Sequence, residues 1–223
     1  MAAYGECRGE PDSERSVRPE RSAVSLGRSM KGHQQAVREG YDFSTVDDAL
    51  GKHVGFREAD PDRDLGRLHA WLNSEHVLPY WEQNDPLPQV HETIRERAAD
   101  PNQTIYIGSL DHTPMSYWEA YWAADDRIGE YYDADPADRG FHLLIGPPEY
   151  LGRGYAAPLV SAMLSFLFEH SETDRVVVEP DARNETVIHV FEQCGFESQR
   201  EVELPDKTAL LLFCDRERFE GDA

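Results

Sequence analysis

Gly152 and Gly154 are the residues whose spacing most clearly indicates a binding site in this sequence. A short apolar run that stops at Gly146 precedes them, and a long, mostly apolar segment follows from Leu159 to Phe168. This order predicts a strand, a turn and the start of a helix. Unpaired backbone NH groups at a helix N-terminus bind anions, and a turn without Cβ atoms lets a phosphate come close to them. We therefore expect an anion site at this turn, with a plain helix start as the alternative.

His142 and Asp181 are candidates for proton transfer. His142 lies on the predicted strand before the glycine turn. A neutral imidazole, with an unperturbed pKa of about 6.5, can accept a proton from a nucleophile as it attacks. Asp181 follows the neighbouring predicted strand and could orient that ring or hold a substrate. Each residue also has a structural interpretation, because a histidine in an apolar strand is often packed and hydrogen-bonded and aspartate is a preferred helix N-cap.

An aromatic segment from Met115 to Ala123 supplies candidates for substrate contact. It follows Gln103 to Ser109 through a turn, so the two stretches predict a β-hairpin. The period of two along a strand places Glu119 and Tyr121 on the same face. We expect both side chains, together with Trp81, to line a substrate pocket. The alternative is that the aromatic rows are core and sheet surface and that Trp81 anchors a loop.

The chain divides into two predicted parts. Residues 1–50 are polar with few large apolar groups, a composition that cannot offset the entropy of ordering, so we predict a disordered N-terminal extension. Residues 53–220 form one predicted domain. Apolar runs in it predict strands at 54–57, 103–109, 115–123, 141–145, 175–179 and 210–214. Helices are predicted from 60 onward and at 89–98, 157–170 and 184–194.

The charge balance of the chain is strongly acidic, with a net charge of −21 and only three lysines, Lys31, Lys52 and Lys207. The chain lacks the positive charge that neutralises phosphates, which argues against nucleic acid or an anionic membrane as a partner. The composition also predicts a halophilic protein, because high salt screens repulsion between carboxylates. An ordinary acidic protein is the alternative.

The chain contains three cysteines, Cys7, Cys194 and Cys214, an odd number without metal-ligand spacing. This pattern predicts no metal site and fits a reducing compartment. No apolar run approaches transmembrane length, and the N-terminus lacks the apolar segment of a signal peptide. We therefore expect a cytoplasmic protein.

The predicted order of strand, phosphate-type turn, helix, strand, helix and strand resembles the GNAT acyltransferase fold, over about residues 54–219. The pattern at the turn in that family is Gln/Arg-x-x-Gly-x-Gly/Ala. This sequence matches it at Gly154 and Ala156 and departs from it at Leu151. Asn184, followed by a helix that ends at Gly195-Phe196, matches a second mark of the family. The resemblance implies an α/β (α+β) class with a mixed central sheet flanked by helices.

The resemblance also implies that the anion at the turn is the pyrophosphate of acetyl-CoA or another acyl-CoA, a co-substrate held mainly by backbone amides. The implied cofactor-binding residues are Leu144, Ile145, Leu151, Gly152, Arg153, Gly154, Tyr155, Ala156 and Asn184. His142 is the implied general base, with Asp181 as its partner. Where many members carry a tyrosine as general acid, this sequence has Phe191, and a phenyl ring cannot donate a proton.

Three stretches resemble the siderophore-biosynthetic acyltransferases within this family: His76 to Trp81, Arg139 to Gly146, and Glu179-Pro180-Asp181-x-x-Asn184. This resemblance implies transfer of an acetyl or other acyl group to a small-molecule acceptor, an amine or hydroxylamine of a siderophore precursor derived from N-hydroxylysine or a diamine. The alternative enzyme is an aminoglycoside 6′-N-acetyltransferase or another small-amine N-acetyltransferase. The alternative from another class is a module that binds acyl-CoA without turnover.

Overall fold

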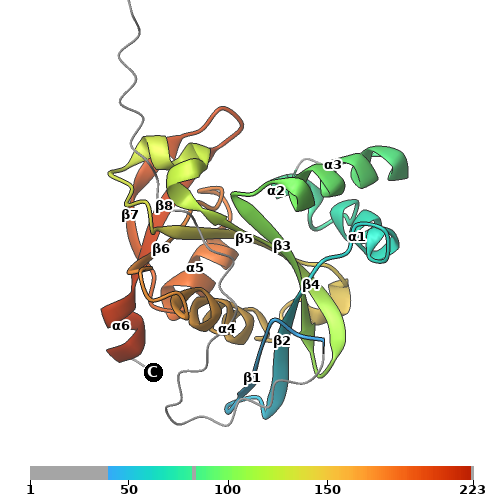
Figure 1. The fold of residues 1–223 in the computed structure, drawn as a ribbon, viewed down its shortest axis with the longest axis horizontal. Helices are drawn as coiled ribbons and strands as arrows, with labels where there is room; N and C mark the ends of the chain where they lie inside the picture. Colours follow the sequence, from blue (N-terminus) through green and yellow to red (C-terminus); the bar gives the residue numbers. More distant parts are fainter. Residues whose placement is uncertain (1–39, 82–83, 222–223) are drawn as a thin grey trace, which may run out of the picture. The chain divides into compact units, whose positions relative to one another are not determined.

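The computed structural model describes residues 40–81 and 84–221 (Figure 1). Its centre is one sheet of eight strands in the order β1-β2-β3-β4-β5-β6-β8-β7. The strands are β1 (Phe43–Asp47), β2 (Lys52–Glu58), β3 (Gln103–Leu110), β4 (Thr113–Trp122), β5 (Arg139–Ile145), β6 (Arg175–Val178), β7 (Glu197–Glu203) and β8 (Thr208–Asp215). Neighbouring strands are antiparallel except β5 and β6, which are parallel. The mixed sheet flanked by helices confirms the predicted α/β (α+β) class.

Helices cover both faces of this sheet (Figure 1). One face carries α1 (Leu65–Leu72), α2 (Leu78–Trp81) and α3 (Leu87–Ala99), and the other carries α4 (Ala156–Phe168) and α5 (Glu185–Gln193). The chain continues into α6 (Arg216–Gly221), and short 3-10 segments span Ala123–Asp125, Arg127–Tyr131 and Pro148–Tyr150. Within the described ranges, the helices are too short or too polar to cross a membrane.

The strands in the middle of the sheet bury both of their faces. On β4, Trp118 and Ala120 join the core under α4 and α5, whereas Tyr117 joins the core under α1 and α3. On β5, Phe141 and Leu144 divide between the same two cores. Side chains alternate across a strand, and burying a large apolar side chain stabilises the fold by about 1.5 to 3 kcal/mol. The two cores therefore fix which side chains of β4 and β5 face each group of helices.

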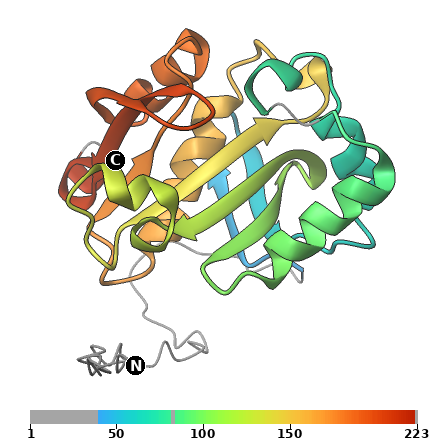
Figure 2. The same cartoon turned by 90° about the horizontal axis from the view of Figure 1, so that it is seen from above.

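β5 and β6 separate after only two paired positions, at Arg139 and Gly140 of β5. Beyond them β5 continues to Ile145 beside β4, without a strand partner on the β6 side among the described residues. β4 and β5 run side by side across the sheet, as Figure 2 shows from above. The separation leaves a gap in the sheet next to the second half of β5.

The backbone of β5 presents polar groups to this gap. The NH of Gly146 donates to the carbonyl of Met115, next to the pair formed by Ser116 and Ile145. Ser116 and Ile145 therefore form a non-hydrogen-bonded pair. Along an antiparallel ladder, such pairs alternate with hydrogen-bonded pairs. The NH and carbonyl groups of Leu143 and Ile145 therefore point away from β4, toward the gap.

The two edge strands, β1 and β7, are the strands that the sequence analysis did not predict. β1 lies within residues 1–50, which were assigned to a disordered extension, whereas Phe43–Asp47 pair with β2. On β7 only Val202 is buried, so no apolar alternation marks that strand. Edge strands expose much of their surface and carry polar side chains, which weakens the sequence signal. Residues 1–39 of the predicted extension lie outside the described residues.

Candidate active site

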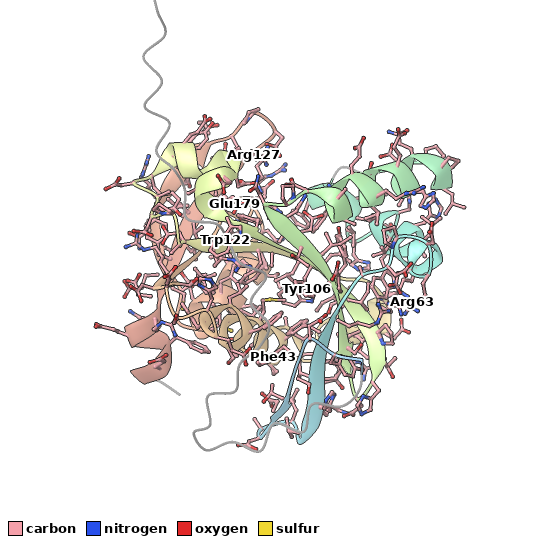
Figure 3. All side chains as sticks on the ribbon, in the orientation of Figure 1. Phe43, Arg63, Tyr106, Trp122, Arg127 and Glu179 are labelled. Atoms are coloured by element: carbon pink, nitrogen blue, oxygen red, sulfur yellow. The ribbon has the colours of Figure 1, made fainter. Side chains whose placement is uncertain are left out.

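A cavity of about 310 Å³ lies where β5 and β6 separate. Its walls come from β4, β5, the end of β6, the helices α2, α3 and α5, the 3-10 segment Arg127–Tyr131, and the loop between β7 and β8. Arg127 and Glu179, both labelled in Figure 3, lie on these walls at the same end of the sheet. The cavity therefore joins the gap in the sheet to side chains from both layers of helices.

His142, at the centre of β5, is held between two carboxylates. Its Nδ1 lies 3.2 Å from Oε2 of Glu119, and its Nε2 lies 2.6 Å from Oε1 of Glu179. Ionised carboxylates only accept hydrogen bonds, so both ring nitrogens must carry a proton. Burial opposes the positive charge, but Glu179 and Glu119 outweigh it and raise the pKa of His142 to about 10. The ring is an imidazolium at neutral pH.

The two carboxylates are buried and have further partners. Arg97 of α3 forms an ion pair with Glu119, and the hydroxyl of Tyr117 donates to the same carboxylate at 2.9 Å. Burial would raise the pKa of Glu119, but Arg97 and then His142 lower it. The hydroxyl of Tyr121 donates to Glu179 at 2.8 Å. Burial would also raise the pKa of Glu179, yet the imidazolium lowers it to about 2.

A glycine makes this arrangement possible. A Cβ atom at Gly140 would lie 2.3 Å from the ring of Tyr121, closer than non-bonded atoms can approach. With hydrogen in its place, the Tyr121 ring packs against β5, 4.9 Å from the His142 ring, and its hydroxyl reaches Glu179. Gly140 therefore sets the position of the Glu179 carboxylate through Tyr121.

Asp181 does not orient His142, because Glu179 occupies that position. The carboxylate of Asp181 accepts hydrogen bonds from the backbone NH and the guanidinium of Arg183, at 2.6 to 3.2 Å. The helix N-cap is Asn184, whose side chain accepts from the NH of Val187 at 3.2 Å. Both Asp181 and Asn184 line the cavity. The alternative that Asp181 holds a substrate is consistent with this position.

The three predicted substrate residues lie around His142 in different ways. Trp81 lines the cavity, with its ring 6.4 Å from the His142 ring and nearly perpendicular to it. Glu119 also lines the cavity, but its carboxylate is engaged by Arg97 and His142. Tyr121 is buried behind them and contacts Glu179.

Leu144 and Ile145, the predicted cofactor-binding residues of β5, lie on different sides of the strand. The side chain of Leu144 is buried in the core under α1 and α3, and Leu143 lines the cavity instead. The carbonyl of Ile145 points to the gap and accepts a hydrogen bond from Nε2 of His76 at 2.8 Å. On the opposite wall, Phe191 packs on Phe141, with ring centroids 5.9 Å apart.

The glycine turn has the geometry of an anion site. Gly152 and Gly154 have φ of 67° and 75°, and nothing lies within 4 Å of a Cβ atom built on either. Among the described residues, the amides from Gly152 to Tyr155 make no hydrogen bond within the protein, while Arg153 reaches back to the carbonyl of Glu149. The turn leads into the thirteen residues of α4. These amides and the helix N-terminus fit a pyrophosphate, and Leu151 and Ala156 flank them.

Glu179, Arg97 and Lys207 are site residues to which the sequence analysis gave no role. Glu179 ends a continuous apolar strand, and a carboxylate directly after such a strand is the signal that could have identified it. Arg97 and Lys207 reach the cavity from a helix and a loop far away in the sequence, and no local pattern marks them. In the described part of the chain, His, Cys, Asp and Glu side chains form no group of three or more that could hold a metal ion.

Comparisons with known proteins agree with this geometry. Residues 60–204 match the family model of the acetyltransferase (GNAT) domain. The N(6)-hydroxylysine O-acetyltransferase of Escherichia coli is 31% identical over 182 residues, which cover 81% of this chain and 58% of that protein. The N-hydroxyputrescine acetyltransferase of Acinetobacter baumannii is 35% identical over 158 residues, covering 70% of this chain and 75% of that protein.

A solved structure supports the same assignment. The aminoglycoside acetyltransferase AAC(6′)-Ib, in complex with coenzyme A and kanamycin, has a TM-score of 0.69 and 31% identity. The match covers 75% of this chain and 98% of that one. The mixed sheet opens between β5 and β6, and the glycine turn precedes α4. Because the family model also matches residues 60–204, the chain belongs to the GNAT acetyltransferase family.

Proposed function

We propose that this protein transfers an acyl group from acyl-CoA to the nitrogen of a hydroxylamine in a siderophore precursor. The observation that carries the acceptor assignment is the double contact of His142 with Glu119 and Glu179. The names of the two curated relatives, which act on N-hydroxylated amines, support the same substrate class.

The donor side of the proposal rests on the turn and on β5. The amides from Gly152 to Ala156 would hold the pyrophosphate of acyl-CoA at the N-terminus of α4. The NH and carbonyl of Leu143 and the NH of Ile145, which face the gap, would meet the amide-containing arm of the same molecule. These two contacts would place the thioester in the cavity beside His142.

The acceptor side follows from the charge of His142. An imidazolium has no lone pair to accept a proton, so His142 cannot activate a protonated alkylamine, whose pKa is near the value of about 10.4 for lysine. A hydroxylamine nitrogen is largely neutral at pH 7 and can attack without prior loss of a proton. We therefore propose a neutral nucleophile, and we revise the role of His142 from a resting general base to a fixed cation.

The proposed reaction forms a C–N bond and breaks the C–S bond of the thioester. After attack the nitrogen is cationic and strongly acidic, so a weak base is sufficient to remove its proton. The ion pair of Glu179 and His142 can accept this proton at the carboxylate and return it to the departing thiolate, which leaves as the CoA thiol. Phe191 cannot supply that proton. Asp181 would hold the acceptor.

Release of the CoA thiol from acetyl-CoA tests the proposal, with N6-hydroxylysine, N-hydroxyputrescine, lysine, putrescine and kanamycin as acceptors. We expect each hydroxylamine to react at least about 10²-fold faster than its parent amine at pH 7, because the parent amine must first lose a proton. Faster turnover of kanamycin or lysine would contradict the proposal. Binding of acetyl-CoA without turnover of any acceptor would indicate a non-catalytic module.

We also propose that the protein works in a cytoplasm of high salt concentration. The net charge of −21 supports the salt adaptation, because counterions screen repulsion between exposed carboxylates. Cys194 and Cys214 are buried free thiols, which fits a reducing compartment.

A further inference from the structure

The carboxylates of the cavity walls are already paired with cations. Four of them line the cavity, and each forms an ion pair: Glu119 with Arg97, Glu179 with His142, Asp181 with Arg183, and Asp206 with Arg127. The last three pairs have N–O distances of 2.6 Å. A cationic acceptor would therefore meet carboxylates whose charge a neighbouring cation already balances. The cavity is therefore poorly suited to an acceptor with surplus positive charge.

Lys207 is the cation on these walls that remains without an ion pair. It lies half-buried in the loop between β7 and β8, and no carboxylate of the described residues lies within 4.0 Å of its ammonium. Lys207 follows Asp206 directly in the sequence, and its charge also acts on the carboxylates of Asp181 and Glu179. The ammonium is near these carboxylates but has no ion pair with any of the described residues, so it can contact an anionic ligand.

The position of Lys207 places this charge on the acceptor side. Lys207 also lines a second hollow of about 50 Å³, together with Tyr80, Trp81, Asp181 and Asp206. The α5 residues of the main cavity, Val187 and Phe191 among them, do not line that hollow. Lys207 therefore lies at the end of the cavity away from α5 and beside Trp81 and Asp181.

We propose that Lys207 is an anion subsite for the acceptor, and that the acceptor carries a carboxylate in addition to its neutral nucleophilic nitrogen. The inference rests on the proposed function, because it takes the cavity as the acceptor site. An ω-(hydroxyamino) amino acid satisfies both requirements. A hydroxylamine derived from a diamine carries an extra positive charge and no anion, so it matches the walls less well.

N6-hydroxylysine and N-hydroxycadaverine test this proposal, since they differ only in the carboxylate. We expect the wild-type protein to prefer N6-hydroxylysine. Lys207→Met should lower kcat/KM for N6-hydroxylysine about tenfold, mainly through KM, because one charge-assisted hydrogen bond is lost at a half-exposed site. The kcat/KM for N-hydroxycadaverine should not fall. Lys207→Glu should reverse the preference.

Lys52→Met is the matched control, because Lys52 lies on β2 outside the cavity and should leave the ratio between the two acceptors unchanged. Equal losses for both acceptors in Lys207→Met, or no loss for either, would overturn the proposal. A loss seen only with succinyl-CoA as donor would also overturn it, by placing the anion on the acyl group.

Calorimetric titration separates this inference from the proposed function. Each hydroxylamine is titrated into the wild-type and Lys207→Met proteins in the presence of CoA. Selectively weaker binding of N6-hydroxylysine to the variant, without turnover by the wild-type protein, would support the subsite and reject the reaction. Equal affinity of both proteins for both compounds would reject the subsite even where turnover is observed.

Discussion

Glu179→Gln tests the charge state of His142 directly. The change removes the negative charge 2.6 Å from Nε2 and keeps the size of the side chain. An opposite charge at this distance raises the pKa of a histidine by about 1 to 3 pH units, so the pKa of His142 should fall from about 10 into the range of about 7 to 9. NMR of the imidazole nitrogens over pH 5 to about 11 measures both values. Glu201→Gln, at an exposed position of β7, is the control.

The same variant should lose stability in a pH-dependent way. The raised pKa of His142 stabilises the fold below pH 6.5, and this contribution is lost as the pH rises toward about 10. The depressed pKa of Glu179 stabilises the fold above pH 4.5, and this contribution is lost as the pH falls toward about 2. Between pH 4.5 and 6.5 both contributions are present, so removing one partner should cost about 3 to 5 kcal/mol there.

Urea unfolding of both proteins at pH 6 and at pH 9.5 measures this cost, which should be smaller at the higher pH. Two results would refute the reasoning. One is a wild-type His142 that titrates near its ordinary pKa of 6.5. The other is a cost below about 1 kcal/mol for Glu179→Gln at pH 6, which is the size of an ordinary point mutation.

Two further predictions concern the donor site and the surface. Gly154→Val should abolish or strongly weaken CoA binding measured by calorimetry, because φ is 75° at this position and a β-branched side chain would cover the amides. A folded variant with unchanged CoA affinity would count against CoA binding at this turn. Lowering the salt concentration should lower the melting temperature measured by calorimetry. The reason is that repulsion among the carboxylates that give the net charge of −21 is then less screened. A melting temperature that stays constant or rises would reject the halophilic interpretation.

The sequence predicted the strands of the sheet interior but not its edges. β4, β5 and β6 bury both faces, so their apolar runs are visible without knowledge of the fold. β1 and β7 lie at the two ends of the strand order and owe their place to backbone pairing with β2 and β8. Backbone pairing leaves no mark in side-chain periodicity, so the domain begins earlier than the sequence analysis placed it.

Prediction from the sequence has the same limit for single residues of the site. His142 could be identified from its place before the glycine turn, but its charge state could not. Its two carboxylate partners are 23 and 37 residues away in the sequence, on β4 and at the end of β6. Only the strand order brings them to the two ring nitrogens. The prediction of a neutral imidazole took the histidine with its unperturbed pKa and therefore missed both neighbours.

The net charge of the chain does not determine the charge of the cavity walls. Exposed carboxylates on the surface interact through water and are screened by salt, so their effect on one another depends on their number. The carboxylates of the cavity lie within hydrogen-bond distance of a cation, where the interaction is stronger and depends on the individual partner. A chain with a net charge of −21 would by composition attract cationic ligands, yet the pairs on its cavity walls leave Lys207 as the charge without an ion-pair partner among the described residues. The acceptor should therefore be recognised in part by its carboxylate.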